Sequence, residues 1–108
     1  MENNFNIVFV TTPNAEVAQK IARKLVHSKL AAGVNILPGM TSIYTWKGEM
    51  CEAGEVLMMI KTQAALFDIL STTIKAEHPY EVPEIVAVSI STGSASYLSW
   101  INEVTQQV

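Results

Sequence analysis

The stretch NIVFVTTPNAEVAQKIARKL, residues 6–25, decides the fold because it changes from a strand pattern to a helix pattern. Residues 6–12 are mostly β-branched or aromatic, which favours a buried strand. Pro13 and Asn14 stop that strand, and either Thr12 or Asn14 can cap the helix that follows. The apolar side of that helix predicts packing against a sheet and consists of Val17, Ala18, Ile21, Ala22 and Leu25.

Two long extended segments come next. We expect Gly33 to end the helical element and residues 34–46 to form a strand that is kinked at Pro38-Gly39. Lys47-Gly48 predicts a hairpin turn there or a few residues later, and the returning strand ends with residues 55–61. Both faces of this returning strand are apolar, with Val56, Met58 and Ile60 on one and Leu57 and Met59 on the other. Such a strand needs cover on both faces.

The second half of the chain repeats the first pattern. Residues 64–77 predict a helix that ends at His78-Pro79, because proline cannot continue it. Residues 84–90 predict the next strand, and Ser94 or Ser96 can cap a short terminal helix. The expected buried stripes are Leu66, Ile69, Leu70 and Ile74 in the first of these helices and Leu98, Ile101 and Val104 in the second.

This order of elements predicts an α+β fold. It is the ferredoxin-like βαββαβ sandwich, with an extra C-terminal helix and both main helices on one face of a four-stranded antiparallel sheet. We expect residues 1–108 to form a single domain. Charged residues are only 16% of the chain, against about 25% in ordinary soluble domains. The open, apolar sheet face is therefore expected to be buried against other copies of the chain.

Charge and composition argue against several binding partners and cellular locations. The formal net charge of -3 offers no attraction for nucleic acid or anionic lipid. We expect no membrane insertion, because the uncharged stretch between Lys29 and Lys47 contains Gly33, Pro38 and Gly39. The polar, acidic start Met1-Glu2-Asn3-Asn4 predicts no leader, and the single Cys51 is compatible with a reducing compartment. We therefore expect a cytoplasmic protein.

The usual catalytic patterns are absent, so we expect that the protein is not an enzyme. Neither glycine-rich nucleotide motif is present. An acylphosphatase would need an arginine after the first strand, where Thr11-Thr12-Pro13-Asn14 has none. An RNA-recognition motif would need aromatic residues on the third strand, where residues 56–61 have none.

One short polar cluster, EHPYEVPE at residues 77–84, holds most of the candidate chemistry. The imidazole of His78 suits copper, zinc or nickel, and Glu77, Glu81 or Glu84 can supply carboxylate oxygens. An equally good interpretation places His78 as a capping cation at a helix C-terminus. Cys51 beside Met50 could bind Cu(I), but a thiolate site would need a second copy of the chain.

Seven motifs across residues 6–104 resemble, in the same order, those of the CutA divalent-cation tolerance proteins. They are Val10-Thr11-Thr12-Pro13-Asn14, Lys29-Leu30-Ala31-Ala32, Asn35-Ile36-Leu37-Pro38-Gly39, Tyr44-x-Trp46-x-Gly48, Ile60-Lys61-Thr62, His78-Pro79-Tyr80-x-Val82-Pro83-Glu84 and Tyr97-Leu98-x-Trp100. The resemblance implies a homotrimer of ferredoxin-like subunits that binds divalent metals of the copper type.

The resemblance also marks what this chain lacks. Members with a proposed copper site carry a cysteine where this chain has Val10, and histidines where it has Glu77 and His78; a frequent family cysteine is Gly33 here. The implied metal site is therefore His78 with Glu77. One imidazole with carboxylates would favour Cu(II) or Zn over Cu(I).

Two other functions remain open. A trimer built like the PII-type regulators would bind a small anion or metabolite in clefts between subunits. The expected lining is Tyr44, Trp46, Lys61, Tyr80, Glu84 and Trp100, with Lys61 as the cation and the aromatic residues as walls. Alternatively, the trimer is a structural adaptor for an unidentified protein partner.

Overall fold

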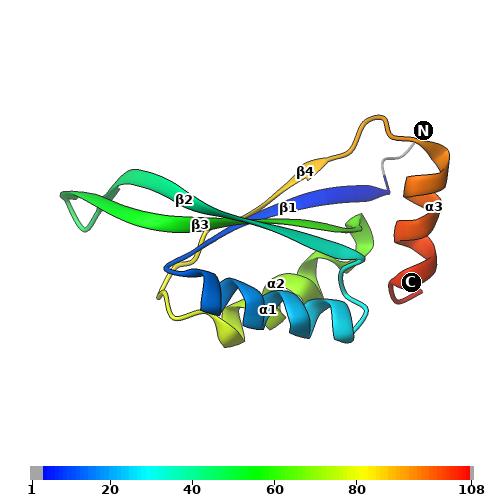
Figure 1. Cartoon of the computed structure of the whole chain (residues 1–108), viewed down its shortest axis with the longest axis horizontal. Coiled ribbons are helices and arrows are strands. Elements are labelled where there is room, and N and C mark those ends of the chain that lie inside the picture. The colour runs from blue at the N-terminus through cyan, green and yellow to red at the C-terminus, as the bar shows by residue number, and fades with distance from the viewer. Residues whose placement is uncertain (1–3, 108) are drawn as a thin grey trace.

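A computed structural model describes residues 4–107, and Figure 1 shows their arrangement. These residues contain four strands and three α-helices, in the order strand, helix, strand, strand, helix, strand, helix. Their bounds are β1 Phe5–Thr12, α1 Ala15–His27, β2 Gly33–Trp46, β3 Glu49–Gln63, α2 Phe67–Glu77, β4 Ile85–Ser89 and α3 Ala95–Val104, with a 3₁₀ turn at Ala64–Leu66 before α2.

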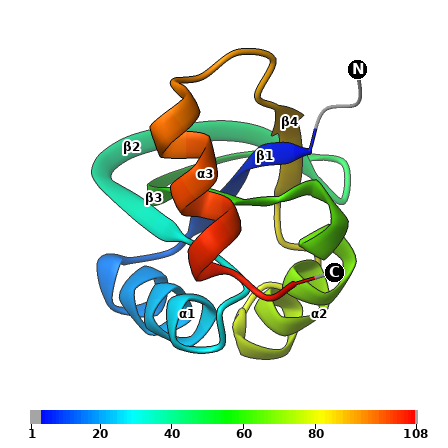
Figure 2. The ribbon, with the colours of Figure 1, turned by 90° about the vertical axis from the view of Figure 1, so that its right-hand side faces the viewer.

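The strands form one antiparallel sheet in the order β2-β3-β1-β4. Helices α1 and α2 lie side by side on one face of it (Figure 1), and α3 crosses the end of the sheet (Figure 2). The predicted α+β fold and its C-terminal helix are therefore confirmed. In this sheet order the two strands of each β-α-β unit are separated by one strand of the other unit. β3 lies between β1 and β2, and β1 lies between β3 and β4.

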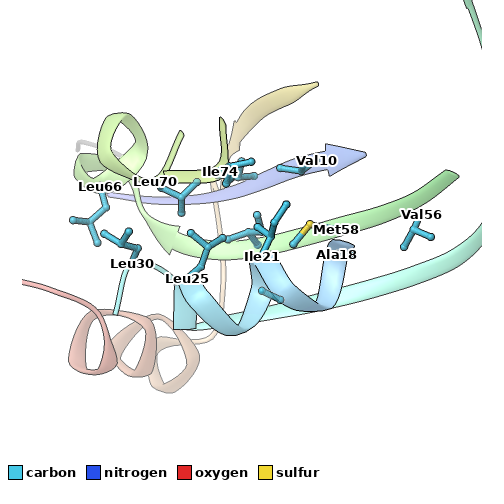
Figure 3. Packing of buried hydrophobic residues seen from close by; sticks show 14 residues of the cluster. Val10, Ala18, Ile21, Leu25, Leu30, Val56, Met58, Leu66, Leu70 and Ile74 are labelled. Carbon is cyan, nitrogen blue, oxygen red and sulfur yellow. The ribbon is translucent and has the colours of Figure 1, made fainter. Parts of the chain in front are cut away.

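The core lies between the sheet and the two helices (Figure 3). Val10 and Met58 from neighbouring strands meet Ile21 and Leu25 from α1, and all four are fully buried. The expected stripe of α2 is only partly correct, because Ile69 is 50% exposed. Leu66, Leu70 and Ile74, at spacings of four residues, are the side chains of that region that face the core.

Helix α1 begins where it was expected to begin but ends earlier. Asn14 is the cap, and its Oδ1 accepts a hydrogen bond of 2.9 Å from the backbone N–H of Val17. The prediction that Gly33 ends the helical element is wrong, because the helix stops at His27 and Gly33 opens β2. Lys29, in the left-handed region at φ 61°, turns the chain away.

The hairpin of β2 and β3 is long, bent and closed by the expected Lys47-Gly48 turn. Both turn residues have positive φ, 51° and 80°, which matches the right-handed twist of the two strands. The register shifts between Leu37 and Met40, where Gly39 has φ 83°. Figure 1 shows the hairpin extending beyond the rest of the sheet.

The sheet face opposite α1 and α2, here called the open face, is apolar. Strand alternation and register place six apolar side chains on it: Ile7, Phe9, Leu57, Met59, Val86 and Val88. Val86 and Val88 are about half exposed. No helix in residues 4–107 is long and apolar enough to cross a membrane.

Candidate functional site

A cleft of about 450 Å³ lies where the hairpin leaves the body of the sheet. We call it the acidic cleft, and its lining is Thr11, Tyr44, Trp46, Glu55, Pro79, Tyr80, Glu81, Val82 and Glu84. These residues come from three strands and from the loop between α2 and β4. The volume falls within the range of about 300 to 1,000 Å³ that is typical of small-molecule sites.

Strand register explains why the sheet residues of the cleft share one face. Thr11 pairs with Leu57 and Met40 pairs with Glu55, while Tyr44 and Trp46 follow Met40 at even spacings. Even spacing along a strand keeps side chains on the same face. The cleft therefore lies on the open face, at its hairpin end.

The loop of residues 79–84 is held over the sheet by His78, which is only 8% exposed. Its Nε2 lies 2.7 Å from the carbonyl oxygen of Thr11, and its Nδ1 lies 3.1 Å from the backbone nitrogen of Tyr80. A carbonyl can only accept and the amide N–H of Tyr80 can only donate. The ring is therefore neutral, with the proton on Nε2, and both nitrogens are occupied.

Glu55 and Tyr80 form the inner part of the cleft. The Tyr80 hydroxyl donates a 2.7 Å hydrogen bond to Oε2 of Glu55. Burial and this carboxylate together raise the pKa of Tyr80 well above its ordinary value. Glu55 is only 7% exposed, yet within residues 4–107 no group donates to its Oε1 and no lysine or arginine pairs with it. The cleft thus has a mostly buried carboxylate with one free oxygen, Oε1, which is open to the solvent of the cleft because no fully buried side-chain oxygen of the described residues lacks a partner.

The electrostatic character of the cleft is acidic. Glu55, Glu81 and Glu84 line it, and no lysine or arginine is among the lining residues. At its edge lies Lys47, whose Nζ is 3.9 Å from Oε1 of Glu81 and 5.7 Å from the centre of the Trp46 ring. A cation would be attracted to this cleft and an anion repelled.

The structure brings together four of the six residues predicted to line a ligand cleft: Tyr44, Trp46, Tyr80 and Glu84. Lys61 and Trp100 lie elsewhere. Lys61 is six residues along β3 from Glu55, which corresponds to about 20 Å. It pairs with Gly33, and the Trp100 ring lies against that glycine. Partial burial lowers the pKa of Lys61.

The predicted metal residues Glu77 and His78 do not converge on a shared point. The Glu77 carboxylate is 3.1 Å from the Lys24 ammonium and 3.6 Å from that of Lys20, and the Lys24 contact is the main reason for its lowered pKa. His78 has no free nitrogen. Within residues 4–107 no three His, Cys, Asp or Glu side chains are grouped to hold a metal ion. Metal binding by this pair stays a prediction.

Glu55 and Thr11 belong to the cleft but were missed from the sequence. Glu55 had one recognisable signal, since it is a carboxylate immediately before the apolar strand run of residues 56–60. Buried ionised groups are rare unless paired or functional. Thr11 had no such signal. Cys51, across the hairpin from Tyr44, is half-buried and does not line the cleft.

Comparison with known proteins supports one family. The model of the CutA1 divalent ion tolerance protein matches residues 6–104. Protein CutA of Mus musculus is 50% identical over 100 residues, which cover 93% of this chain and 56% of that protein. The chain thus spans little more than half of this mammalian relative.

Solved structures are similar over almost their whole length. The divalent cation tolerance protein (Cut A1) of Thermus thermophilus has 49% identity and a TM-score of 0.92, and the match covers 94% of this chain and 99% of that chain. The CutA of Archaeoglobus fulgidus, described as a periplasmic divalent cation tolerance protein, has 37% identity, a TM-score of 0.92 and the same coverage. The chain therefore belongs to the CutA1 divalent ion tolerance family.

Proposed function

We propose that this protein acts in divalent-cation tolerance by binding Cu(II) or Zn(II) without catalysing a reaction, and that the acidic cleft holds the ion. The observation that carries the proposal is the free oxygen of Glu55 inside a cleft that also contains Glu84. Carboxylate oxygens accept divalent ions, and by the general order of affinities Cu(II) and Zn(II) rank high at such sites.

The pair Glu77 and His78 is the alternative position for the ion. Binding there would require the ring to give up its bond to Thr11 or to Tyr80, and Glu77 to separate from two lysines. Glu55 and Glu84 in the acidic cleft are paired with no lysine or arginine among the described residues, so an ion between them would break no ion pair. This difference favours the cleft.

We also propose that the working form is a homotrimer. The open face is apolar, and the surface area of the chain is 6601 Å², against about 5,900 Å² expected for a compact monomer of its mass. Packing of open faces against other subunits would place a neighbour at the border of the cleft. Such a neighbour could supply the remaining ligands of the metal ion. This would explain why the described residues of a single chain hold no group of three potential metal ligands.

Three other sequence-based predictions remain beside this proposal: a sensor function, a cytoplasmic location and an adaptor role. A small-molecule sensor fits the cleft volume, although the acidic lining favours a cation over the expected anion. A cytoplasmic location stays a prediction, because the Archaeoglobus relative is described as periplasmic. An adaptor role would need a protein partner, which pull-down experiments would have to identify.

Titration calorimetry tests the metal site. Cu(II) or Zn(II) is added to chelator-treated protein, and Glu55→Gln and Glu84→Gln should each weaken binding about tenfold, a loss of about 1.4 kcal/mol. Glu52→Gln, on the same hairpin but outside the cleft, is the matched control and should bind like wild type. Absence of binding, or loss only in Glu77→Gln and His78→Gln, contradicts the cleft site. Light scattering should give three times the chain mass of 11.8 kDa.

A further inference from the structure

One ammonium group already lies at the edge of the acidic cleft. The Nζ of Lys47 lies over the Trp46 ring, 5.7 Å from its centre, and 3.9 Å from the Glu81 carboxylate. The Lys47 side chain is 71% exposed, so it is held only at the surface. An aromatic face together with a carboxylate is a recognised environment for organic ammonium ions. The rim of the cleft therefore shows, within one chain, the chemistry that would bind such a group.

The inner part of the cleft repeats this combination around a more buried carboxylate. Tyr44 and Tyr80 supply aromatic surface, and Glu55 supplies a carboxylate whose Oε1 receives no hydrogen bond within residues 4–107. Glu55 is more than nine-tenths buried. Because a carboxylate that is less exposed to water interacts more strongly with a cation, an ammonium at Glu55 would be held more tightly than Lys47 is held by Glu81, whose side chain is 74% exposed.

We propose that the acidic cleft binds a linear aliphatic diamine, with one ammonium group at Glu55 and the carbon chain along Tyr44 and Trp46. The second ammonium takes the position between Trp46 and Glu81 that Lys47 now occupies. The alkyl chain accounts for the aromatic walls, which a bare metal ion would leave unused. The inference uses the same cleft as the proposed metal site but does not need a metal to be bound.

The position of Lys47 gives the proposal an unusual consequence. If the ligand's second ammonium displaces Lys47 from Trp46 and Glu81, then Lys47 competes with the ligand. Removing the charge of Lys47 should therefore strengthen binding of the diamine. If the cleft bound an anion instead, removing that charge would weaken binding. Lys47→Asn is the suitable variant, because asparagine tolerates the positive φ of 51° at this turn position.

The test is calorimetric titration of the full chain with 1,5-diaminopentane, in the presence of a chelator. We expect Glu55→Gln and Trp46→Leu each to weaken binding about tenfold and Lys47→Asn to strengthen it several-fold. Glu52→Gln, outside the cleft, should leave binding unchanged. Circular dichroism melting of each variant establishes that it is folded, and 1-pentylamine should bind more weakly than the diamine.

Several results would overturn the inference: no heat of binding at millimolar diamine, equal affinity in Trp46→Leu and wild type, or weaker binding in Lys47→Asn. The same samples are titrated with Zn(II) without chelator. Zinc binding with no diamine binding removes this inference and leaves the proposed function standing. Diamine binding with no zinc binding supports the inference and removes the proposed metal site.

Discussion

Replacing His78 with alanine separates a structural role for this residue from a role as a metal ligand. The substitution removes the hydrogen bond to the Thr11 carbonyl at 2.7 Å and the one from the Tyr80 amide at 3.1 Å. Thr11 is buried and Tyr80 is partly buried, so water replaces these partners incompletely. Each lost partner costs about 1 to 2 kcal/mol, and the free energy of unfolding should fall by about 2 to 4 kcal/mol.

The assay is urea unfolding of metal-free protein at one fixed protein concentration, because assembly would make the stability depend on concentration. For a domain of this size the loss corresponds to a decrease in melting temperature of roughly 8 to 16 °C. His78→Gln can still donate to Thr11 and should lose about half as much. His27→Ala is the matched control, since His27 is exposed at the end of α1 and should change stability by about 0.5 kcal/mol or less.

A metal-free His78→Ala protein as stable as wild type would refute this reasoning. If that protein also failed to gain stability from Cu(II) or Zn(II), His78 would be a metal ligand. The sequence-based pair of Glu77 and His78 would then replace the cleft as the site of the ion.

Two further predictions concern the hairpin turn and one surface ion pair. Gly48→Ala places a Cβ on a residue with φ 80° and should lower the free energy of unfolding, measured in urea, by about 1 to 2 kcal/mol. Lys47→Asn should leave that free energy unchanged or raise it slightly. If Gly48→Ala were as stable as wild type, the turn would not be formed as described. The pKa of Glu77 lies below its ordinary value of 4.5, mainly because of Lys24. The ionised carboxylate therefore stabilises the folded state fully at pH values above 4.5. This contribution disappears as the pH falls through the lowered pKa. Urea unfolding of wild type and Glu77→Gln at several pH values should therefore give a stability difference that is constant above about pH 5 and shrinks in more acidic solution; a difference that grows on acidification would contradict this sign.

The element order was predictable because each element reports its own periodicity. The β-branched run of residues 6–12 and the apolar stripe after Asn14 each reflect burial of one local segment, and Lys47-Gly48 has a recognisable turn pattern. Three local predictions were wrong, at Gly33, Ile69 and Val104, because Val104 was expected in the buried stripe of the last helix and is 36% exposed. At Gly33 and Ile69 neighbouring elements decided the outcome: pairing with β3 makes Gly33 part of β2, and Ile69 projects away from the surface that α2 presents to the sheet.

The acidic cleft could be predicted only in part. Tyr80 and Glu84 stood in a short polar cluster, and Tyr44 and Trp46 in a motif of their own, so these residues were recognisable as candidates. Glu55 was not, because nothing local shows that it meets a residue 25 positions later. Lys61 was assigned to the same cleft by its chemistry, but distance along β3 separates it from Glu55.

The amino-acid sequence alone determined the order of strands and helices, the side of each that is buried and membership of the family, because these depend on local propensity, spacing and motifs. Only the tertiary structure decided the chemistry of His78 and Glu55. The ring nitrogens of His78 are occupied by Thr11, 67 residues away, and by the backbone of Tyr80. Strand register and loop closure bring such partners together, and no periodicity within one segment records them.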